Sequence, residues 1–522
     1  MHPHTLIEFL LLLLIAASAI AIVTSRFKVP YTVFLVFGGI LIDLFRVPIV
    51  DKVGGAMGNL LSPDVIFMVF LPGLLFEAGI NIHIRHLRAT FVPILLLALA
   101  GVLAAAFIAA YIVHWGVGIP LQAALVFGVL IAATDPISVL MLFKEIGAPK
   151  RLSVILEGES LFNDGTAVVV FQILVASVAG GTLSLGDGVV RFLVVAIGGG
   201  LLGLALGYVT SKLTERIDEP RVEIMLTTVL AYGSFLLAEQ LHLSGVIATV
   251  GAGLMIGNFG AEAGMSPRTR VALWSFWEYW GFVINSIVFL IIGIEVHVFD
   301  LIGHGAAIGI SVAAVLLGRM ATVYLLIPLG NLLSEPISWA WRHVLVWGGI
   351  HGSVSLALVL TLPDDFPARE LVLSMTFGVV AFSIIIQGLT VKPLMRGLGI
   401  SMGQENEYDQ VRTQRMALTA GLKDLEQLHE EHLISGPVFE ELSGEAKSRI
   451  REIRKQVENL HTHHPELVAK EMQDARKQMI LSEKSSIKKA LGEGWISLHT
   501  AEEMLTRADK ALEDSEDSEA TD

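Results

Sequence analysis

What this sequence lacks excludes several classes of protein. It has no cysteine among its 522 residues, which excludes disulfide bonds, thiolate metal sites and thiol catalysis. Charged residues make up only 16% of the chain, whereas soluble proteins carry about a quarter. The 36 Lys and Arg residues are outnumbered by 50 Asp and Glu residues, so the basic surface that nucleic-acid binding requires is missing. Both an ordinary soluble domain and a nucleic-acid-binding protein are therefore excluded.

Long apolar runs are abundant instead, and hydrophobic residues reach 53% of the chain. About 20 apolar residues in a helix cross a hydrocarbon core of about 30 Å. The sequence therefore predicts an all-α polytopic membrane protein with thirteen transmembrane helices between its start and residue 400. These helices are expected at residues 6–25, 30–46, 64–82, 90–114, 120–143, 152–179, 187–211, 222–241, 243–259, 271–295, 303–328, 341–361 and 370–391.

The remaining part, residues 401–522, has a different composition. It carries 26 acidic and 16 basic residues, against 24 and 20 in residues 1–400. Amphipathic patterns predict a mostly helical tail, and the Ser, Glu and Asp run at Glu513–Asp522 is expected to be disordered. No catalytic motif occurs in the tail, so we expect no enzyme. We expect a cytoplasmic regulatory module with a possible regulator as partner; an expendable acidic appendage is the alternative.

Basic residues alternate between successive loops. Fifteen lie in one set of loops and only four, Arg46, Lys52, Arg191 and Arg369, in the other. Basic loops stay in the cytoplasm during insertion, so we expect an external N-terminus and a cytoplasmic C-terminus. The fifteen are Arg26, Lys28, Arg85, Arg88, Lys144, Lys150, Arg151, Lys212, Arg216, Arg221, Arg268, Arg270, Arg342, Lys392 and Arg396.

Thirteen helices divide into two six-helix repeats of inverted topology and one linker helix. In that division the fifth and twelfth helices correspond, and both contain residues that interrupt a helix. The fifth contains Thr134-Asp135-Pro136, and the twelfth contains Gly348, Gly349 and Gly352 around His351. Unwound backbone at membrane depth can offer carbonyl groups to a cation. We therefore expect two broken helices that cross.

Ionisable residues inside the membrane are costly, so each is a candidate functional residue. Residues 157–164 (EGESLFND) concentrate them in the sixth helix. At 100° per residue, Glu157, Ser160 and Asp164 share one stripe, while Glu159 and Asn163 lie on another. Asp164 is expected near the midplane. The candidates are Glu77, Asp135, Glu157, Glu159, Asp164 and Arg319.

Arg319 cannot lose its charge, so it needs an acidic partner. Glu159 is the predicted partner because its stripe faces away from Asp164, where an arginine would compete with a bound cation. This pair is expected to be structural. Glu77 lies near the cytoplasmic end of the third helix, where a role in the ion site and simple exposure to water are equally compatible with the sequence.

A carboxylate at the midplane, surrounded by hydroxyl, amide and backbone oxygens, can bind Na⁺, Li⁺ or K⁺. Asp164 can also take a proton, so cation and proton compete for it. If the protein changes the side it faces only when one is bound, obligatory exchange follows. One exchanging carboxylate implies one cation per proton and hence electroneutral transport, unless Asp135 also titrates.

The residues Ala133-Thr134-Asp135-Pro136 and the segment Glu159–Asp164 (ESLFND) closely resemble the monovalent cation:proton antiporter family, in its Na⁺/H⁺ exchanger branch of the prokaryotic NhaP type. The resemblance implies a homodimer in a prokaryotic plasma membrane, without a cofactor. It implies that Asp164 carries Na⁺ and the proton, with Thr134, Ser160 and Asn163 as ligands or supports. Asp135 would balance the helix dipoles at the crossing.

One residue departs from the family pattern. Relatives commonly have an arginine in the twelfth helix where this chain has His351. Histidine titrates near neutral pH, so His351 either contributes to the pH profile of transport or acts as a neutral hydrogen-bonding residue. K⁺/H⁺ exchange on the same scaffold and proton-coupled symport of an organic solute are the alternative functions, although a symporter would need a roomier site.

Overall fold

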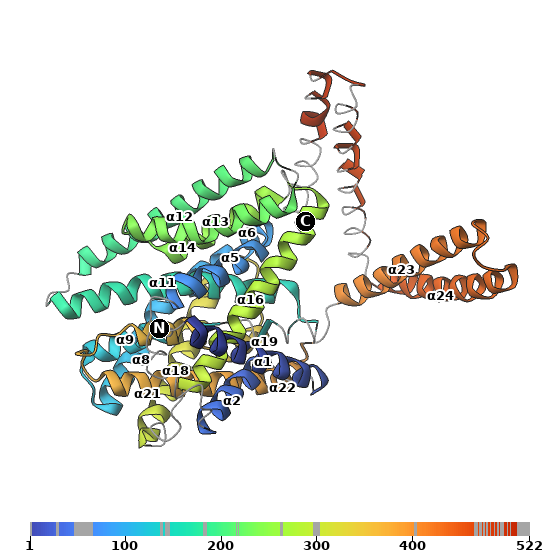
Figure 1. Cartoon of the computed structure of the whole chain (residues 1–522). Coiled ribbons are helices and arrows are strands. Elements are labelled where there is room, and N and C mark those ends of the chain that lie inside the picture. Colours follow the sequence, from blue (N-terminus) through green and yellow to red (C-terminus); the bar gives the residue numbers. More distant parts are fainter. Residues whose placement is uncertain are drawn as a thin grey trace. The chain divides into compact units, whose positions relative to one another are not determined.

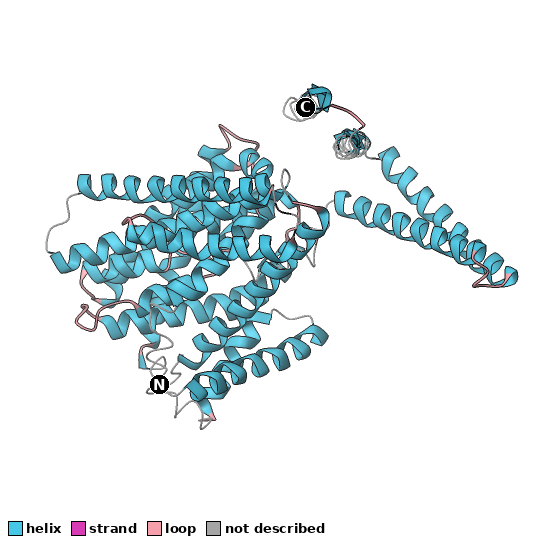
Figure 2. Cartoon of the chain, turned by 45° about the horizontal axis from the view of Figure 1, so that its top comes forward, coloured by secondary structure: helices cyan, strands magenta, loops and turns pink. Residues whose placement is uncertain are grey.

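The computed structural model describes residues 3–27, 31–45, 66–135, 139–140, 143, 147–180, 185–215, 217, 219–261, 265–295, 303–400 and 404–463, and separate helical stretches between 468 and 508. The predicted disordered end, Glu513–Asp522, lies outside the described residues, and the part of the predicted helical tail after residue 463 lies partly outside them. Every regular element among the described residues is a helix (Figure 2).

The chain divides into two compact units, Met1–Ser401 and Met402–Asp522. Most helices of the first unit are labelled in Figure 1, and several of them continue through a short π-helical stretch, written η. The helices of this unit are α1 (Pro3–Phe27), α2 (Tyr31–Leu44), η1 (Ile66–Phe70), α5 (Leu71–Asn81), α6 (Ile84–Ala89), α7 (Phe91–Leu95), η2 (Leu96–Gly101), α8 (Val102–Val117), α9 (Leu121–Leu130), α11 (Lys150–Gly180), α12 (Leu185–Thr214), α13 (Pro220–Gln240), α14 (Gly245–Met255), η3 (Ile256–Gly260), α16 (Pro267–Glu295), α18 (Gly305–Gly330), α19 (Trp339–Trp347), α20 (Ser353–Leu360), α21 (Arg369–Phe382), η4 (Ser383–Gln387) and α22 (Gly388–Gly397).

Seven helices within the described residues are long and apolar enough to cross a membrane, and shorter apolar helices accompany them. Each of the thirteen predicted segments overlaps helical residues, but thirteen crossings remain a prediction. The seven are Phe91–Val117, Lys150–Ser177, Gly186–Thr214, Pro220–Gln240, Arg268–Ile294, Gly305–Gly330 and Arg369–Gly397.

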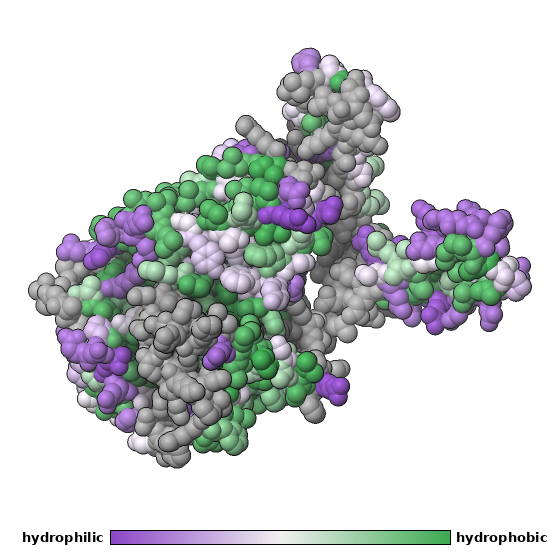
Figure 3. Space-filling model, in the orientation of Figure 1, coloured by the Kyte–Doolittle hydropathy of each residue, from purple (hydrophilic) through white to green (hydrophobic). Residues whose placement is uncertain are grey.

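Small residues bring α12 against α14. A Cβ added to Gly207 would lie 3.1 Å from the carbonyl oxygen of Ala252 and 2.6 Å from Met255 Cβ, so only glycine permits this approach. The remaining surface of α12 is exposed and apolar, with Leu201 at 63% exposure. Figure 3 shows hydrophobic residues over this part of the first unit. This face is suited to lipid, because lipid tails solvate apolar side chains.

The two predicted interruptions are present. Helix α9 ends at Leu130, and residues 133–135 are not helical. The twelfth predicted helix is two short helices, α19 and α20, separated by residues 348–352. A Cβ on Gly349 would lie 2.9 Å from Arg319 Nε, so this glycine leaves room for the guanidinium.

The second unit contains the hairpin of α23 (Gln404–Glu430) and α24 (Gly436–His463). Its small apolar contact is formed by Val457 with Val411 and Leu460. In the view of Figure 3, hydrophilic residues line the edges of this hairpin, with hydrophobic residues between them, which is the pattern of amphipathic helices.

Candidate ion-binding site

The interrupted segment after α9 is held on two sides. Ala133 O accepts hydrogen bonds from His351 Nδ1 at 3.1 Å and from Ser355 Oγ at 3.3 Å. The next amide, Thr134 N–H, points the other way and donates to Asn163 Oδ1 at 3.3 Å. This peptide group therefore lies between the second interruption and α11.

The next peptide group, between Thr134 and Asp135, also has partners on both sides, but here the carbonyl group faces α11 and the amide group faces the second interruption. Thr134 O accepts a hydrogen bond from Ser160 Oγ on α11. Asp135 N–H donates to Ile350 O at 2.6 Å, which joins the two interruptions through their main chains. Four backbone groups that a helix would have satisfied thus find partners elsewhere, as burial in the membrane requires.

Asn163 contacts Thr134 twice. Besides accepting from its amide, Asn163 donates from Nδ2 to Thr134 Oγ1 at 2.7 Å. Asn163 is fully buried. Because both ends of its amide group are occupied by Thr134, the geometry suits a residue that positions Thr134 and its hydroxyl group.

The predicted separation of Ser160 and Asn163 onto different faces needs correction. Both side chains contact Thr134, although the stripe assignment places Asn163 with Glu159, on a face turned away from Asp164. Ser160 and Asn163 are three residues apart on a helix and therefore only about 60° apart in angle. One residue on an adjacent segment can contact both.

Asp164 is half-buried on α11. It is the fifteenth residue of this 31-residue helix, so it lies about 21 Å from the start at 1.5 Å per residue. Its Oδ1 is buried and makes no hydrogen bond with the described residues. Asp164 also lies close enough to Asp135 for the two carboxylates to interact electrostatically. These two acidic groups and the unwound backbone form the candidate site.

Asp135 lies against the start of α20. A Cβ added to Gly352 would be 2.9 Å from Asp135 Cγ and closer still to other atoms of that side chain. Gly352 immediately precedes Ser353, the first residue of α20. A carboxylate at this end of a helix is stabilised by the helix dipole, which is the role that the family resemblance implied for Asp135.

Arg319 on α18 lies against Glu159 on α11, as the stripe argument predicted. Both guanidinium Nη atoms donate to the carboxylate, Nη2 at 2.8 Å to Oε2. Arg319 also donates to Leu345 O, from Nε at 3.2 Å and from Nη2 at 3.0 Å. Leu345 belongs to the last turn of α19. The Arg319 guanidinium therefore also satisfies a carbonyl group that the interruption leaves without a helical partner.

Glu77 is half-buried on α5 and accepts a hydrogen bond from Asn81 Nδ2 at 2.8 Å. A Cβ on Gly281 would lie 3.3 Å from the Glu77 carboxyl carbon. Gly281 is near the middle of the long helix α16, so Glu77 contacts the central part of another membrane helix. This contact places Glu77 beside the middle of α16, and its role in the ion site stays a prediction.

His351 is buried, with 4% of its surface exposed. Together with Arg319 and Thr134 it lines a small pocket whose other walls are apolar residues of η2, α8 and α18, and of α9 with the two residues that follow it. A carbonyl oxygen can only accept, so the contact with Ala133 requires a proton on His351 Nδ1. This geometry suits the hydrogen-bonding alternative.

Two buried polar residues are absent from the predicted set. Ser355 contacts Ala133 only because the two interruptions meet, which local periodicity cannot show. Glu223, in the first turn of α13, is fully buried and accepts a hydrogen bond from Thr269 Oγ1 at 3.2 Å. Glu223 stands at the beginning of the predicted helix 222–241, so a count of acidic residues inside the apolar segments includes it.

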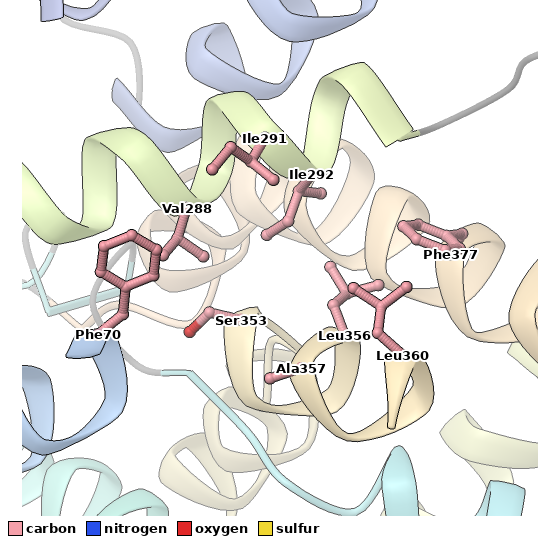
Figure 4. A pocket seen from close by; sticks show the side chains of 9 residues that line it. All are labelled: Phe70, Val288, Ile291, Ile292, Ser353, Leu356, Ala357, Leu360 and Phe377. Atoms are coloured by element: carbon pink, nitrogen blue, oxygen red, sulfur yellow. The ribbon is translucent and has the colours of Figure 1, made fainter. Parts of the chain in front are cut away.

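A second pocket, between α16 and α20, is unsuited to ions. Val288, Ile291 and Ile292 of α16 face Leu356 and Leu360 of α20 across it (Figure 4). Ser353 is the only polar residue that lines it. The pocket lacks an ionisable lining residue, so the polar cluster around Thr134 and Asp164 is the better candidate.

Comparison with known proteins identifies the family. A model of the transmembrane sodium/hydrogen exchanger family matches residues 11–397, which contain both interruptions and Asp164. The chain belongs to the sodium/hydrogen exchanger family. Membership confirms the predicted resemblance. It also confirms the prediction that the chain is a multi-pass membrane transporter and not an enzyme.

Individual relatives align with most of this chain. It is 37% identical over 510 residues to the Na⁺/H⁺ antiporter NhaG of Bacillus atrophaeus, with 96% of each chain covered. It is 40% identical to the Na⁺/H⁺ antiporter NhaH of Halobacillus dabanensis, covering 76% of this chain and 98% of that one. The tail is thus included in the match to NhaG.

A solved structure gives the fold. The sodium proton antiporter MjNhaP1 of Methanocaldococcus jannaschii matches with a TM-score of 0.61 at 20% identity, covering 76% of this chain and 99% of that chain. The polytopic fold of the NhaP type is therefore confirmed.

Proposed function

We propose that this protein is a secondary active antiporter that exchanges Na⁺ for H⁺ across the membrane. Asp164 would bind the cation and the proton in turn. The observation that carries the proposal is the buried Oδ1 of Asp164, which makes no hydrogen bond with the described residues and lies within electrostatic range of Asp135 of the first interruption. The relatives of the chain include proteins named Na⁺/H⁺ antiporters.

The proposed Na⁺ ligands are Asp164, Ser160 and Thr134, since carboxylate, hydroxyl and carbonyl oxygens are hard ligands suited to Na⁺. Asn163 and Asp135 would support them, and Glu77 would join the site from α5. A single exchanging carboxylate makes the exchange electroneutral, one Na⁺ for one H⁺. Glu159 and Arg319 would remain paired throughout, as a structural element.

Transport would proceed by alternating access in a homodimer. We propose thirteen transmembrane helices arranged as two inverted six-helix repeats and a linker helix, with the N-terminus external and the C-terminus cytoplasmic. The interrupted segments that contact each other through Asp135 and Ile350 correspond in the two repeats. We propose a prokaryotic plasma membrane as the location and no cofactor besides the transported ions.

The proposal is tested by transport in proteoliposomes with an imposed pH gradient, comparing Na⁺, Li⁺ and K⁺. We expect Na⁺-dependent exchange in the wild type and none in Asp164→Asn. Asp187→Asn, which changes a carboxylate in the first turn of α12, is the matched control and should transport normally. Exchange by Asp164→Asn would remove the carrier assignment, and a response to membrane potential would remove electroneutrality.

Two further roles are separately testable. If His351 contributes to the pH profile, His351→Arg should shift that profile, and an unchanged profile would remove support for this role. If the tail is regulatory, truncation after Gly403 should change the transport rate or its pH dependence; unchanged rate, pH dependence and expression would favour an expendable tail.

A further inference from the structure

Two donors, one from the second interruption and one from the first turn of α20, converge on one carbonyl of the first interruption. Ala133 O lies 3.1 Å from His351 Nδ1 and 3.3 Å from Ser355 Oγ. All three residues are buried, with Ser355 and Ala133 at 0% and 1% exposure. A buried carbonyl without donors would be costly, so these two side chains satisfy Ala133 in place of a helical amide.

The bonds to Ala133 O also fix the orientation of the Thr134 amide group. The peptide group is planar, so the Ala133 carbonyl and the Thr134 amide lie on opposite sides of one rigid unit. The amide donates to Asn163 at 3.3 Å, and Asn163 also holds the Thr134 hydroxyl at 2.7 Å. A rotation of this peptide group would therefore displace both the hydroxyl and the next carbonyl of Thr134.

We propose that His351, assisted by Ser355, is a positioning residue that sets the cation affinity of the site by orienting the Ala133–Thr134 peptide group. The inference rests on the proposed exchange of Na⁺ at Asp164. His351 acts through Thr134 and does not itself bind the ion. Its contribution is a hydrogen-bond donor at a fixed place, so another donor at that place should serve as well.

The charges around His351 explain why a fixed donor suits this position. Arg319 lines the same pocket and is already engaged by Glu159 and Leu345 O. Asp135, on the first interruption, bonds through its amide to Ile350, the residue preceding His351. The arginine that relatives commonly have here would add a second permanent positive charge next to Arg319, whereas His351 supplies a donor without that charge.

The substitutions follow from the geometry. His351→Ala removes the donor. His351→Asn retains one, because the amide Nδ2 of asparagine is attached at the same place along the side chain as Nδ1 of histidine. Ser355→Ala removes the second donor alone. His114→Ala is the matched control, since His114 Nδ1 bonds to the carbonyl of Ile119 at 2.6 Å in the α8–α9 connection, away from the interruptions.

The experiment measures the apparent KM for Na⁺ and the maximal rate of full-length protein in proteoliposomes at one fixed pH. For His351→Ala we expect a rise in KM of about tenfold, the equivalent of one lost buried hydrogen bond, with a maximal rate within about twofold of wild type. His351→Asn should restore most of the affinity, Ser355→Ala should raise KM by about threefold, and His114→Ala should leave it unchanged.

Several outcomes would overturn the inference. An unchanged KM in both His351→Ala and Ser355→Ala would do so, as would a loss of maximal rate alone, which indicates a structural role. If His351→Ala fails to fold, the KM values of His351→Asn and Ser355→Ala still decide. Absence of exchange in the wild type, or its survival in Asp164→Asn, would instead contradict the proposed function.

Discussion

The two interrupted helices solve the same physical problem with opposite residue types. The first, after α9, uses Thr134 and Asp135, whose side chains join the polar cluster. The second, between α19 and α20, uses glycines, which leave room for Arg319 and Asp135 to lie against the chain. One interruption thus supplies chemical groups, and the other supplies space, backbone oxygens and donors. Substitutions in the two segments should therefore fail in different ways.

The largest effect is expected where space is removed from the second interruption. In Gly352→Ala the new methyl group would overlap the Asp135 side chain, so the interruptions must move apart. A displacement of about 1 Å can cost about a hundredfold in rate, and we expect exchange in proteoliposomes to fall by about that factor. Gly233→Ala in α13, where a Cβ meets nothing within 4 Å, is the control; equal activity in the two variants would contradict the steric argument.

The next effect concerns Arg319, whose guanidinium group bonds to both α19 and α11. Arg319→Ala leaves Glu159 buried at 1% exposure without its guanidinium, and removal of one partner from a buried pair costs about 3–5 kcal/mol. We expect a markedly lower midpoint of thermal unfolding in detergent. The double variant Glu159→Leu, Arg319→Met should lose much less, because no charge stays buried. A double variant as unstable as Arg319→Ala would show that the Leu345 contact matters more than the pair.

A chemical group removed from the first interruption should affect affinity more than folding. Thr134→Val keeps the shape but loses the acceptor for Asn163 Nδ2, and an unsatisfied buried donor costs about 1–3 kcal/mol. We expect the apparent KM for Na⁺ to rise by about tenfold, measured from initial rates. Thr166→Val on α11, which loses only a bond to Phe162 O within the helix, should leave KM unchanged. Similar KM values for Thr134→Val and Thr166→Val would contradict the assignment of Thr134 to the ion site.

The smallest effect is expected at the last residue of α19, Trp347, whose carbonyl is bonded by a side chain of η4. Gln387 Nε2 donates to Trp347 O at 3.1 Å, so Gln387→Leu should destabilise the protein by about 1 kcal/mol and change KM for Na⁺ little. Thermal unfolding of Gln387→Leu in detergent measures the loss of stability, and transport in proteoliposomes measures KM. A large change in KM would mean that the second interruption also shapes the cation site directly.

Much of the fold follows from local sequence patterns. Apolar length located the helices, and Thr134-Asp135-Pro136 and the glycines around His351 marked where two of them end. The Glu159 and Arg319 contact was predicted because a buried arginine requires an acid and the periodicity of α11 left one acid free to provide it. The separation of Ser160 from Asn163 was wrong, because a stripe drawn on one helix ignores where its neighbour lies.

The sequence by itself determined which residues are buried in the membrane, where the helices break and which charged groups must pair, since each depends on the high cost of polar groups in lipid. The tertiary structure decided which groups the broken segments use in place of helical hydrogen bonds. The bonds from His351 and Ser355 to Ala133, and from Asp135 to Ile350, join positions more than 200 residues apart. No local pattern encodes them, because backbone amides and carbonyls are the same at every residue and only packing selects their partners.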